Sequence, residues 1–265
     1  MTTMTATAPP LRSPREDMRG LPRAVRSEWI KISTVRTTKA LGWLTVALGL
    51  VSAWATAEFA NDPVQTVSQV FVFSTVLTGT LASVSGVLLF TSEAQHGTLA
   101  GTLTAQPSRW VTSAAKTVMA AARGLWLGAA GMTAGFVGGL LGGLEVGSAA
   151  TIAETAMWAL LYTALAAVLG LGVGMIVRHS SAALSGVLVW GLVLENLLTV
   201  FTPESVSRFL PFVAGNNLLG IVGTGAFAEE ATYALTRPQT GVVFGAYAAA
   251  ALVAGTALLY RRDTT

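Results

Sequence analysis

Long apolar runs alternate with short polar segments along most of this chain, and the pattern predicts six membrane-spanning helices. A span requires about 20 mostly apolar residues, because an α-helix rises about 1.5 Å per residue and the hydrocarbon layer is about 30 Å thick. Six segments satisfy this requirement: 40–57, 67–90, 120–141, 156–177, 182–200 and 242–260. We therefore expect an all-α, polytopic membrane protein whose six-helix transmembrane domain covers 40–262.

The N-terminal part of the chain follows a different pattern. Residues 1–20 are rich in Thr, Pro and Arg and lack apolar periodicity, which predicts a disordered cytoplasmic tail. In 21–39 the apolar residues recur at spacings of four, four and three, at Leu21, Val25, Trp29 and Ile32. This spacing predicts an amphipathic helix that lies in the headgroup layer, with Trp29 as its interfacial anchor.

Two polar connections interrupt the apolar runs. The segment 91–110, between the second and third predicted spans, has too few apolar residues to cross a membrane, and its Gly and Pro predict short helical pieces with turns. A cytoplasmic partner could reach this segment. The longest outer connection, 201–240, contains Pro203, Pro211 and Pro238 and predicts short interfacial or re-entrant helices.

The distribution of basic residues predicts the orientation. The chain has 16 Lys and Arg residues, and if both termini are cytoplasmic all of them except Arg208 and Arg237 fall inside, as the positive-inside rule requires. A basic tail directly before an apolar helix is typical of a membrane flank, so the expected partner is the lipid bilayer and not nucleic acid. The excess of Arg over Lys and the abundant Ala and Gly suggest a GC-rich bacterial genome. We expect a multi-pass protein of the bacterial cytoplasmic membrane.

Composition argues against a soluble globular protein and against most catalytic chemistry. The chain is 52% hydrophobic and 11% charged, whereas soluble domains carry about 25% charged residues. It has no Cys, only two His and no HExxH or Gly-x-Ser-x-Gly motif. None of its three Lys follows Gly, so the chain lacks the Gly-Lys-Ser/Thr of a P-loop. We therefore expect no catalytic residues, no metal and no cofactor bound by this chain.

Two ionisable residues fall near or within predicted spans. Arg123 lies near the inner end of the third span, where its long side chain can snorkel to the headgroups. Glu195 lies deeper, about a turn and a half from the outer end of the fifth span, and a carboxylate cannot snorkel that far. It must be paired, protonated or in a polar cavity. Two roles stay open for Glu195: a buried structural residue, or a residue of a substrate path.

Glycine spacing predicts close helix packing. The third span and its C-terminal end carry Gly131, Gly135, Gly139 and Gly143 at intervals of four residues. Gly170 and Gly174 repeat this spacing once in the fourth span. Small residues on one helix face allow another backbone to approach closely. We expect these glycines to pack within the chain, with a dimer seam as the alternative.

Two segments of the sequence resemble a known family. The run Arg26-Ser27-Glu28-Trp29-Ile30-Lys31 before the first span, and the run from Glu93 through Gly97-Thr98-Leu99 to Pro107, Arg109 and Lys116, resemble the corresponding motifs of bacterial type-2 ABC transporter permeases. The order of the spans and the long last outer connection are also similar. The chain departs from the family pattern at Gln95-His96, where an aromatic and a basic residue are common.

The resemblance implies a function and a set of partners. In that family two permease chains, identical or paralogous, pair with two separate ATPase subunits that hydrolyse ATP and drive export of amphipathic, lipid-like or drug-like compounds. It implies that the following residues contact the ATPase subunit: Glu28, Lys31, Glu93, His96, Gly97, Thr98 and Arg109. Two alternatives stay open, an ATPase-independent secondary transporter or channel, and a membrane scaffold or immunity protein.

Overall fold

The structure, a computed structural model, describes residues 14–59, 66–220 and 235–261. Within these ranges the chain is helical and forms no β-strand; its one isolated parallel bridge joins Thr66 to Glu145. Six helical segments are long and apolar enough to cross a membrane. The expected all-α fold and the six spans are therefore confirmed, and the chain is a multi-pass membrane protein by the length and apolarity of its helices.

The six spans coincide with the predicted segments, although most helices are longer. They are α2 (Arg36–Phe59), α3 (Val67–Gln95), α5 (Arg109–Leu141), α6 (Ala149–Val177), the composite α7 (Ser180–Val189), η1 (Trp190–Leu194) and α8 (Glu195–Phe201), and α11 (Arg237–Arg261). The largest difference is at α5, which begins at Arg109 and not near residue 120. Hydrophobicity detects only the part of a helix that fits hydrocarbon, and a helix continues wherever its backbone hydrogen bonds do.

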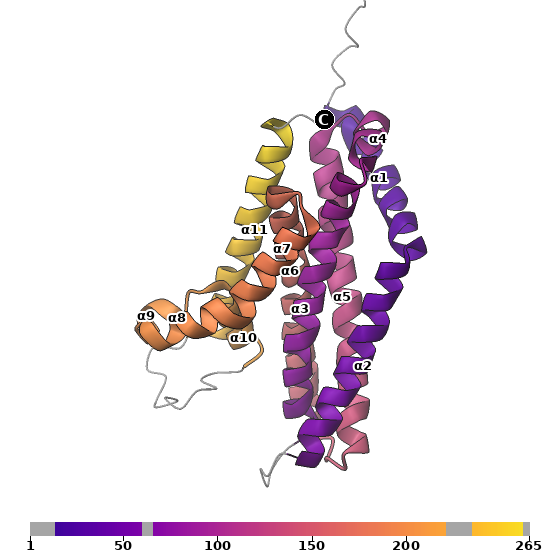
Figure 1. Cartoon of the computed structure of the whole chain (residues 1–265). Helices are drawn as coiled ribbons and strands as arrows, with labels where there is room; N and C mark the ends of the chain where they lie inside the picture. Colours follow the sequence, from indigo (N-terminus) through magenta and orange to yellow (C-terminus); the bar gives the residue numbers. More distant parts are fainter. Residues whose placement is uncertain (1–13, 60–65, 221–234, 262–265) are drawn as a thin grey trace, which may run out of the picture.

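Helices α3 and α6 form the centre of the bundle, and α2, α5 and α11 pack around them (Figure 1). Two glycines permit the central contact. A Cβ atom added at Gly86 of α3 would collide with the carbonyl oxygen of Ala167, and one added at Gly170 of α6 would collide with that of Ser83. The α3 and α6 backbones therefore touch directly, as small residues allow in membrane helices.

The glycine ladder of α5 is confirmed in part. Gly131, Gly135 and Gly139 are buried within the chain, and a Cβ atom at Gly131 would collide with Thr78 of α3. Gly143 does not belong to this face, because α5 ends at Leu141 and Gly143 forms part of the following turn with φ of 81°. A spacing of four predicts a shared face only while the helix continues.

The N-terminal helix differs from its predicted bounds. Helix α1 (Pro14–Thr34) begins within the stretch that we expected to be disordered; residues 1–13 lie outside the described residues. Pro14 is compatible with this start, because the backbone N–H groups of the first helical turn have no acceptor within the helix and proline lacks this N–H. The expected single helix over 21–39 is interrupted at Val35, before α2 begins. The Thr34 hydroxyl donates hydrogen bonds to the carbonyls of Ile30 and Lys31, and such local bonds compete with the helical pattern.

Short helices occupy the connections, as predicted. Helix α4 (Thr98–Ala105) follows α3, while α9 (Glu204–Ser207) and α10 (Pro211–Leu218) follow the fifth span. Part of the predicted outer connection, 221–234, lies outside the described residues. Helices α1 and α4 and the C-terminal end of α11 lie at one end of the bundle, called here the α4 end (Figure 1).

Candidate functional site

The polar segment after α3 forms a sharp turn followed by an exposed helix. Gly97 adopts the left-handed conformation, with φ of 70°, and ends α3 so that α4 can start in a new direction. Within α4 the Leu99 side chain is buried, whereas His96, Gly97 and Thr98 are exposed. His96 donates from Nδ1 to the Ser92 carbonyl, 2.7 Å away. The segment therefore presents a small polar surface at the α4 end.

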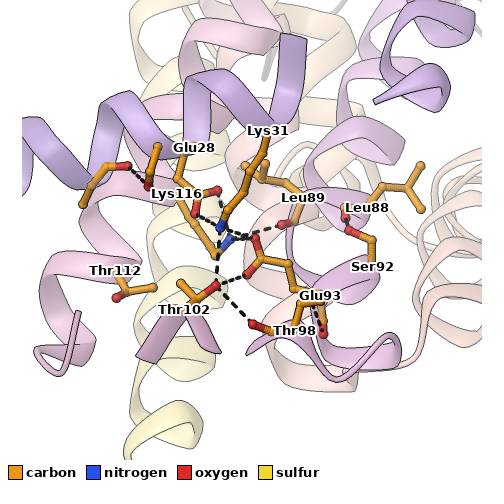
Figure 2. Close-up of polar contacts among 12 residues, drawn as sticks. Glu28, Lys31, Leu88, Leu89, Ser92, Glu93, Thr98, Thr102, Thr112 and Lys116 are labelled. Carbon is orange, nitrogen blue, oxygen red and sulfur yellow. Dashed lines mark hydrogen bonds and ion pairs between the residues drawn. The ribbon is translucent and has the colours of Figure 1, made fainter. Parts of the chain in front are cut away.

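Beneath this surface lies a cluster of four charged side chains, called here the charge cluster: Glu28 and Lys31 from α1, Glu93 from α3 and Lys116 from α5 (Figure 2). Lys116 Nζ lies 3.0 Å from Glu28 Oε2 and 2.9 Å from Glu93 Oε1. Lys31 Nζ lies 2.9 Å from Glu28 Oε1 and 2.9 Å from Glu93 Oε1. Each carboxylate is thus shared by both lysines.

Helix α4 is joined to the charge cluster through Thr102. The Thr102 hydroxyl accepts a hydrogen bond of 3.4 Å from Lys31 Nζ and donates one of 3.4 Å to Glu93 Oε2. Lys116 Nζ also donates to the carbonyl of Leu89, 3.4 Å away (Figure 2). The network therefore connects four elements: α1, α3, α4 and α5.

The electrostatics of the charge cluster are balanced. The Lys116 side chain is 0% exposed and the Glu28 side chain 4% exposed, so neither charge is stabilised by water. Two lysines and two glutamates alternate, and each buried charge has partners of opposite sign. Burial disfavours the charge of Lys31, but its hydrogen bonds and Coulombic attraction to Glu28 and Glu93 outweigh this effect and raise the pKa of Lys31. Lys31 is therefore held charged.

The structure places the predicted ATPase-contact residues in two groups. Glu28 and Glu93 are buried, and the partly exposed Lys31 pairs with both of them. His96, Gly97 and Thr98 lie on the exposed turn and first residue of α4. The sequence analysis did not name Lys116 as a site residue, although it belongs to the motif that carries the family resemblance.

Arg109 lies on neither of these surfaces. Its Nη1 atom donates to the carbonyls of Leu259 and Tyr260 in the last turn of α11, the latter at 3.2 Å. A cation satisfies unpaired carbonyls at a helix C-terminus and interacts favourably with the helix dipole. Arg109 thus joins the N-terminal end of α5 to the C-terminal end of α11, a role that the sequence analysis did not predict.

Glu195 is buried and caps another helix. Its carboxylate accepts hydrogen bonds from Trp190 Nε1 at 2.6 Å, from the Phe212 N–H at 3.1 Å and from the Val213 N–H at 2.9 Å. Phe212 and Val213 lie in the first turn of α10, where backbone N–H groups lack partners and a negative charge is favourable. The structure therefore shows Glu195 as a buried helix cap, and its place in a substrate path stays a prediction.

A cavity of about 590 Å³ lies between the α1–α2 connection on one side and α3 and α5 on the other, next to the charge cluster. Its apolar lining consists of Ile32, Val35, Leu41, Leu88, Leu89 and Ala120. Hydroxyl and charged groups line the rest, among them Ser85, Thr38 and Arg123. A space of this size, mostly apolar with a few polar groups, has the properties of a small-molecule site.

The Arg123 side chain contacts residues of α2, α3 and α5. Its Nε donates to Ser85 Oγ at 3.3 Å, its Nη2 donates to the Thr38 carbonyl, and its guanidinium lies 5.1 Å from the centre of the Trp126 ring. All these partners are neutral, and none of the ion pairs found among the described residues includes Arg123. Arg123 is thus a cation of the cavity wall without a carboxylate beside it.

The comparisons with known proteins leave the family open. No protein-family model matches the sequence, and a search of curated proteins found no match. Among the described residues, no three His, Asp or Glu side chains are grouped closely enough to hold a metal ion. The class that the fold defines is that of a multi-pass helical membrane protein.

Proposed function

We propose that this chain is the permease subunit of an ATP-driven ABC exporter and works with a separate ATPase subunit. The observation that carries the proposal is the position of α4, an exposed short helix whose Thr102 is bonded to a buried charge cluster shared by α1, α3 and α5. A chain without a P-loop needs an external source of energy, and α4 offers a surface through which a partner could supply it.

The charge cluster supports transmission of force from this surface. The ion pairs of Lys116 are short and shielded from water, so separating α1, α3 and α5 would leave unpaired charges in a medium of low dielectric constant, and Thr102 joins α4 to this unit by hydrogen bonds. A displacement of α4 by a partner therefore moves α1, α3 and α5 with it. ATP-driven closure of the partner would rock these helices between inward- and outward-facing arrangements.

The proposal fixes an orientation and a set of partners. The α4 end faces the cytoplasm of a bacterium, in agreement with the positive-inside rule, and both termini are inside. The chain pairs with a second permease chain, identical or paralogous. Helices α2 and α7 to α8, whose apolar surfaces are largely uncovered within the chain, offer faces for this contact and for lipid. The exported compound is amphipathic, lipid-like or drug-like.

The test is co-purification with the ATPase encoded beside this chain. Ala100 is exposed on α4, and Ala150 is exposed at the opposite end of the bundle. An Ala100→Arg substitution should weaken binding of the ATPase about tenfold, or ~1.4 kcal/mol, whereas Ala150→Arg should leave it unchanged. A folded wild-type chain that binds no ATPase, or an equal effect of both substitutions, contradicts the proposal. Flux through the purified chain alone would instead favour a secondary transporter or channel.

A further inference from the structure

The cavity beside Arg123 has features that the proposed function does not use. We propose that it binds an anionic membrane amphiphile, with the acidic headgroup on Arg123 and one hydrocarbon chain along the apolar wall. This inference does not rest on the ATPase partnership, because it concerns a site formed entirely by this chain.

The charges around the cavity favour an anion. Glu28, Lys31 and Glu93 line one side, but their charges are neutralised within the charge cluster, where Lys116 completes the balance. Arg123 is left as a positive charge with neutral partners. A guanidinium has five N–H donors, and the bonds described use only some of them. The remaining donors match the oxygens of a phosphate or carboxylate, which arginine binds in bidentate geometry.

The shape of the lining favours an occupant with a hydrocarbon part. Ile32 and Val35 approach from the α1–α2 side, and Leu88 and Leu89 approach from α3. A free inorganic anion would leave this apolar surface in contact with water, and burying such surface stabilises a complex by about 25 cal/mol per Å². An amphiphile satisfies both the cation and the apolar wall.

The position of the cavity favours the membrane as the source of the occupant. Trp126 packs on Arg123 and is 52% exposed, and Trp43 on the facing helix is 75% exposed. A Cβ atom at Gly42 would lie 2.7 Å from the Trp126 ring, so α2 and α5 meet at this level. Exposed tryptophans are typical of the membrane–water interface. Arg123 therefore lies close to the level of lipid headgroups.

The experiment measures lipid selectivity of the full chain alone. The purified protein in mild detergent is mixed with equal amounts of phosphatidylglycerol, which is anionic, and phosphatidylcholine, which is zwitterionic, and bound lipid is counted by native mass spectrometry. The wild-type chain should retain phosphatidylglycerol preferentially. Arg123→Gln should lower this preference about tenfold, the scale of one charge-assisted hydrogen bond, and Arg123→Lys, which keeps the charge but not the bidentate geometry, should lower it less.

Matched variants separate the cavity from general electrostatic attraction. Arg26→Gln removes a charge from an exposed position of α1 that does not line the cavity, and it should change the preference less than twofold. Ser85→Leu fills part of the cavity and keeps the Arg123 charge, although it removes the hydroxyl that accepts from Arg123 Nε, so it should also reduce lipid binding. Thr133→Leu replaces another hydroxyl residue by leucine on an exposed part of α5 and should have no effect.

Three results would overturn the proposal. The first is an equal loss of preference in Arg26→Gln and Arg123→Gln, which would indicate general charge attraction. The second is unchanged binding in Ser85→Leu, which would show that lipid does not enter the cavity and which does not require the arginine variant to fold. The third is competition by inorganic phosphate at the same concentration as the lipid, which would show a simple anion site.

Discussion

Removing Lys116 is the sharpest test of the charge cluster. Lys116 Nζ pairs with Glu28 and Glu93, and its side chain is 0% exposed. Replacement by Met keeps a similar volume but leaves two buried carboxylates with the single cation Lys31. Breaking a buried ion pair by removing one partner costs about 3–5 kcal/mol. This is a large fraction of the ~5–15 kcal/mol that stabilises a folded domain.

The assay is thermal unfolding in detergent, followed by tryptophan fluorescence. At about 2–4 °C per kcal/mol for a chain of this size, Lys116→Met should lower Tm by roughly 10 °C. Lys39→Met, at an exposed position of α2, is the matched control and should shift Tm by about 1–2 °C at most.

A second substitution separates unpaired charge from lost packing. In Lys116→Met combined with Glu28→Gln, Lys31 and Glu93 remain as one ion pair, so the double variant should recover part of the lost stability. The expected coupling is about 1–3 kcal/mol in favour of the double variant. If Lys116→Met unfolds at the wild-type temperature, or if the two losses simply add, the charge cluster does not act as a balanced unit.

The remaining predictions concern other parts of the bundle. Glu195→Ala leaves Trp190 Nε1 and two N–H groups of α10 without their acceptor, and it should lower the unfolding free energy by about 2–3 kcal/mol. Glu195→Gln should cause a smaller loss. An unchanged Tm would contradict the capping role. Gly86→Ala should lower Tm strongly, because the added Cβ atom would collide with the backbone of α6. Gly101→Ala, in open space on α4, should not lower Tm. Similar losses at both positions would argue against the close contact of α3 and α6. The pKa of Lys31 is raised above 10.5 in the folded state, so the contribution of its charge to stability should be complete below pH 10.5. This contribution should disappear as the pH rises through the pKa that Lys31 has in the folded state. Lys31→Met should remove this alkaline dependence of Tm.

The six spans were predictable because they depend on a single local property, the length of an apolar run. Their ends were not, since α5 continues to Arg109 through residues too polar to be recognised as membrane-spanning. The break at Val35 was also missed, because an amphipathic spacing does not show where local hydroxyl bonds compete with the helix.

The site was predictable in its composition but not in its geometry. Motif resemblance selected Glu28, Lys31 and Glu93, but it did not show that Glu28 and Glu93 are buried and that the partly exposed Lys31 pairs with both. Spacing along the chain cannot reveal that Lys116 of α5 pairs with Glu28 and Glu93, because the pairing depends on how α1, α3 and α5 pack. For Glu195 a signal did exist: Pro211 at the first position of a helix marks an N-terminus in need of an acceptor.

The cavity and the charge cluster share a wall, and this contact links the two proposals. Glu28, Lys31, Glu93 and Thr102 belong to the network that holds α4, and they also line the cavity. A partner that displaces α4 must therefore move part of the lining. Suppose that a bound ATPase changes the affinity of this chain for an anionic lipid by some factor. By thermodynamic linkage, the bound lipid must then change the affinity of the chain for the ATPase by the same factor.

This reciprocity can be measured in nanodiscs with and without phosphatidylglycerol. We expect the two factors to agree in the wild-type chain and to exceed about fivefold, the lower end of typical coupling between sites. Thr102→Val, which removes the hydroxyl between α4 and the charge cluster, should bring both factors toward one while leaving each partner able to bind. If phosphatidylglycerol and the ATPase bind independently in the wild-type chain, the shared wall transmits nothing, and the two sites must be explained separately.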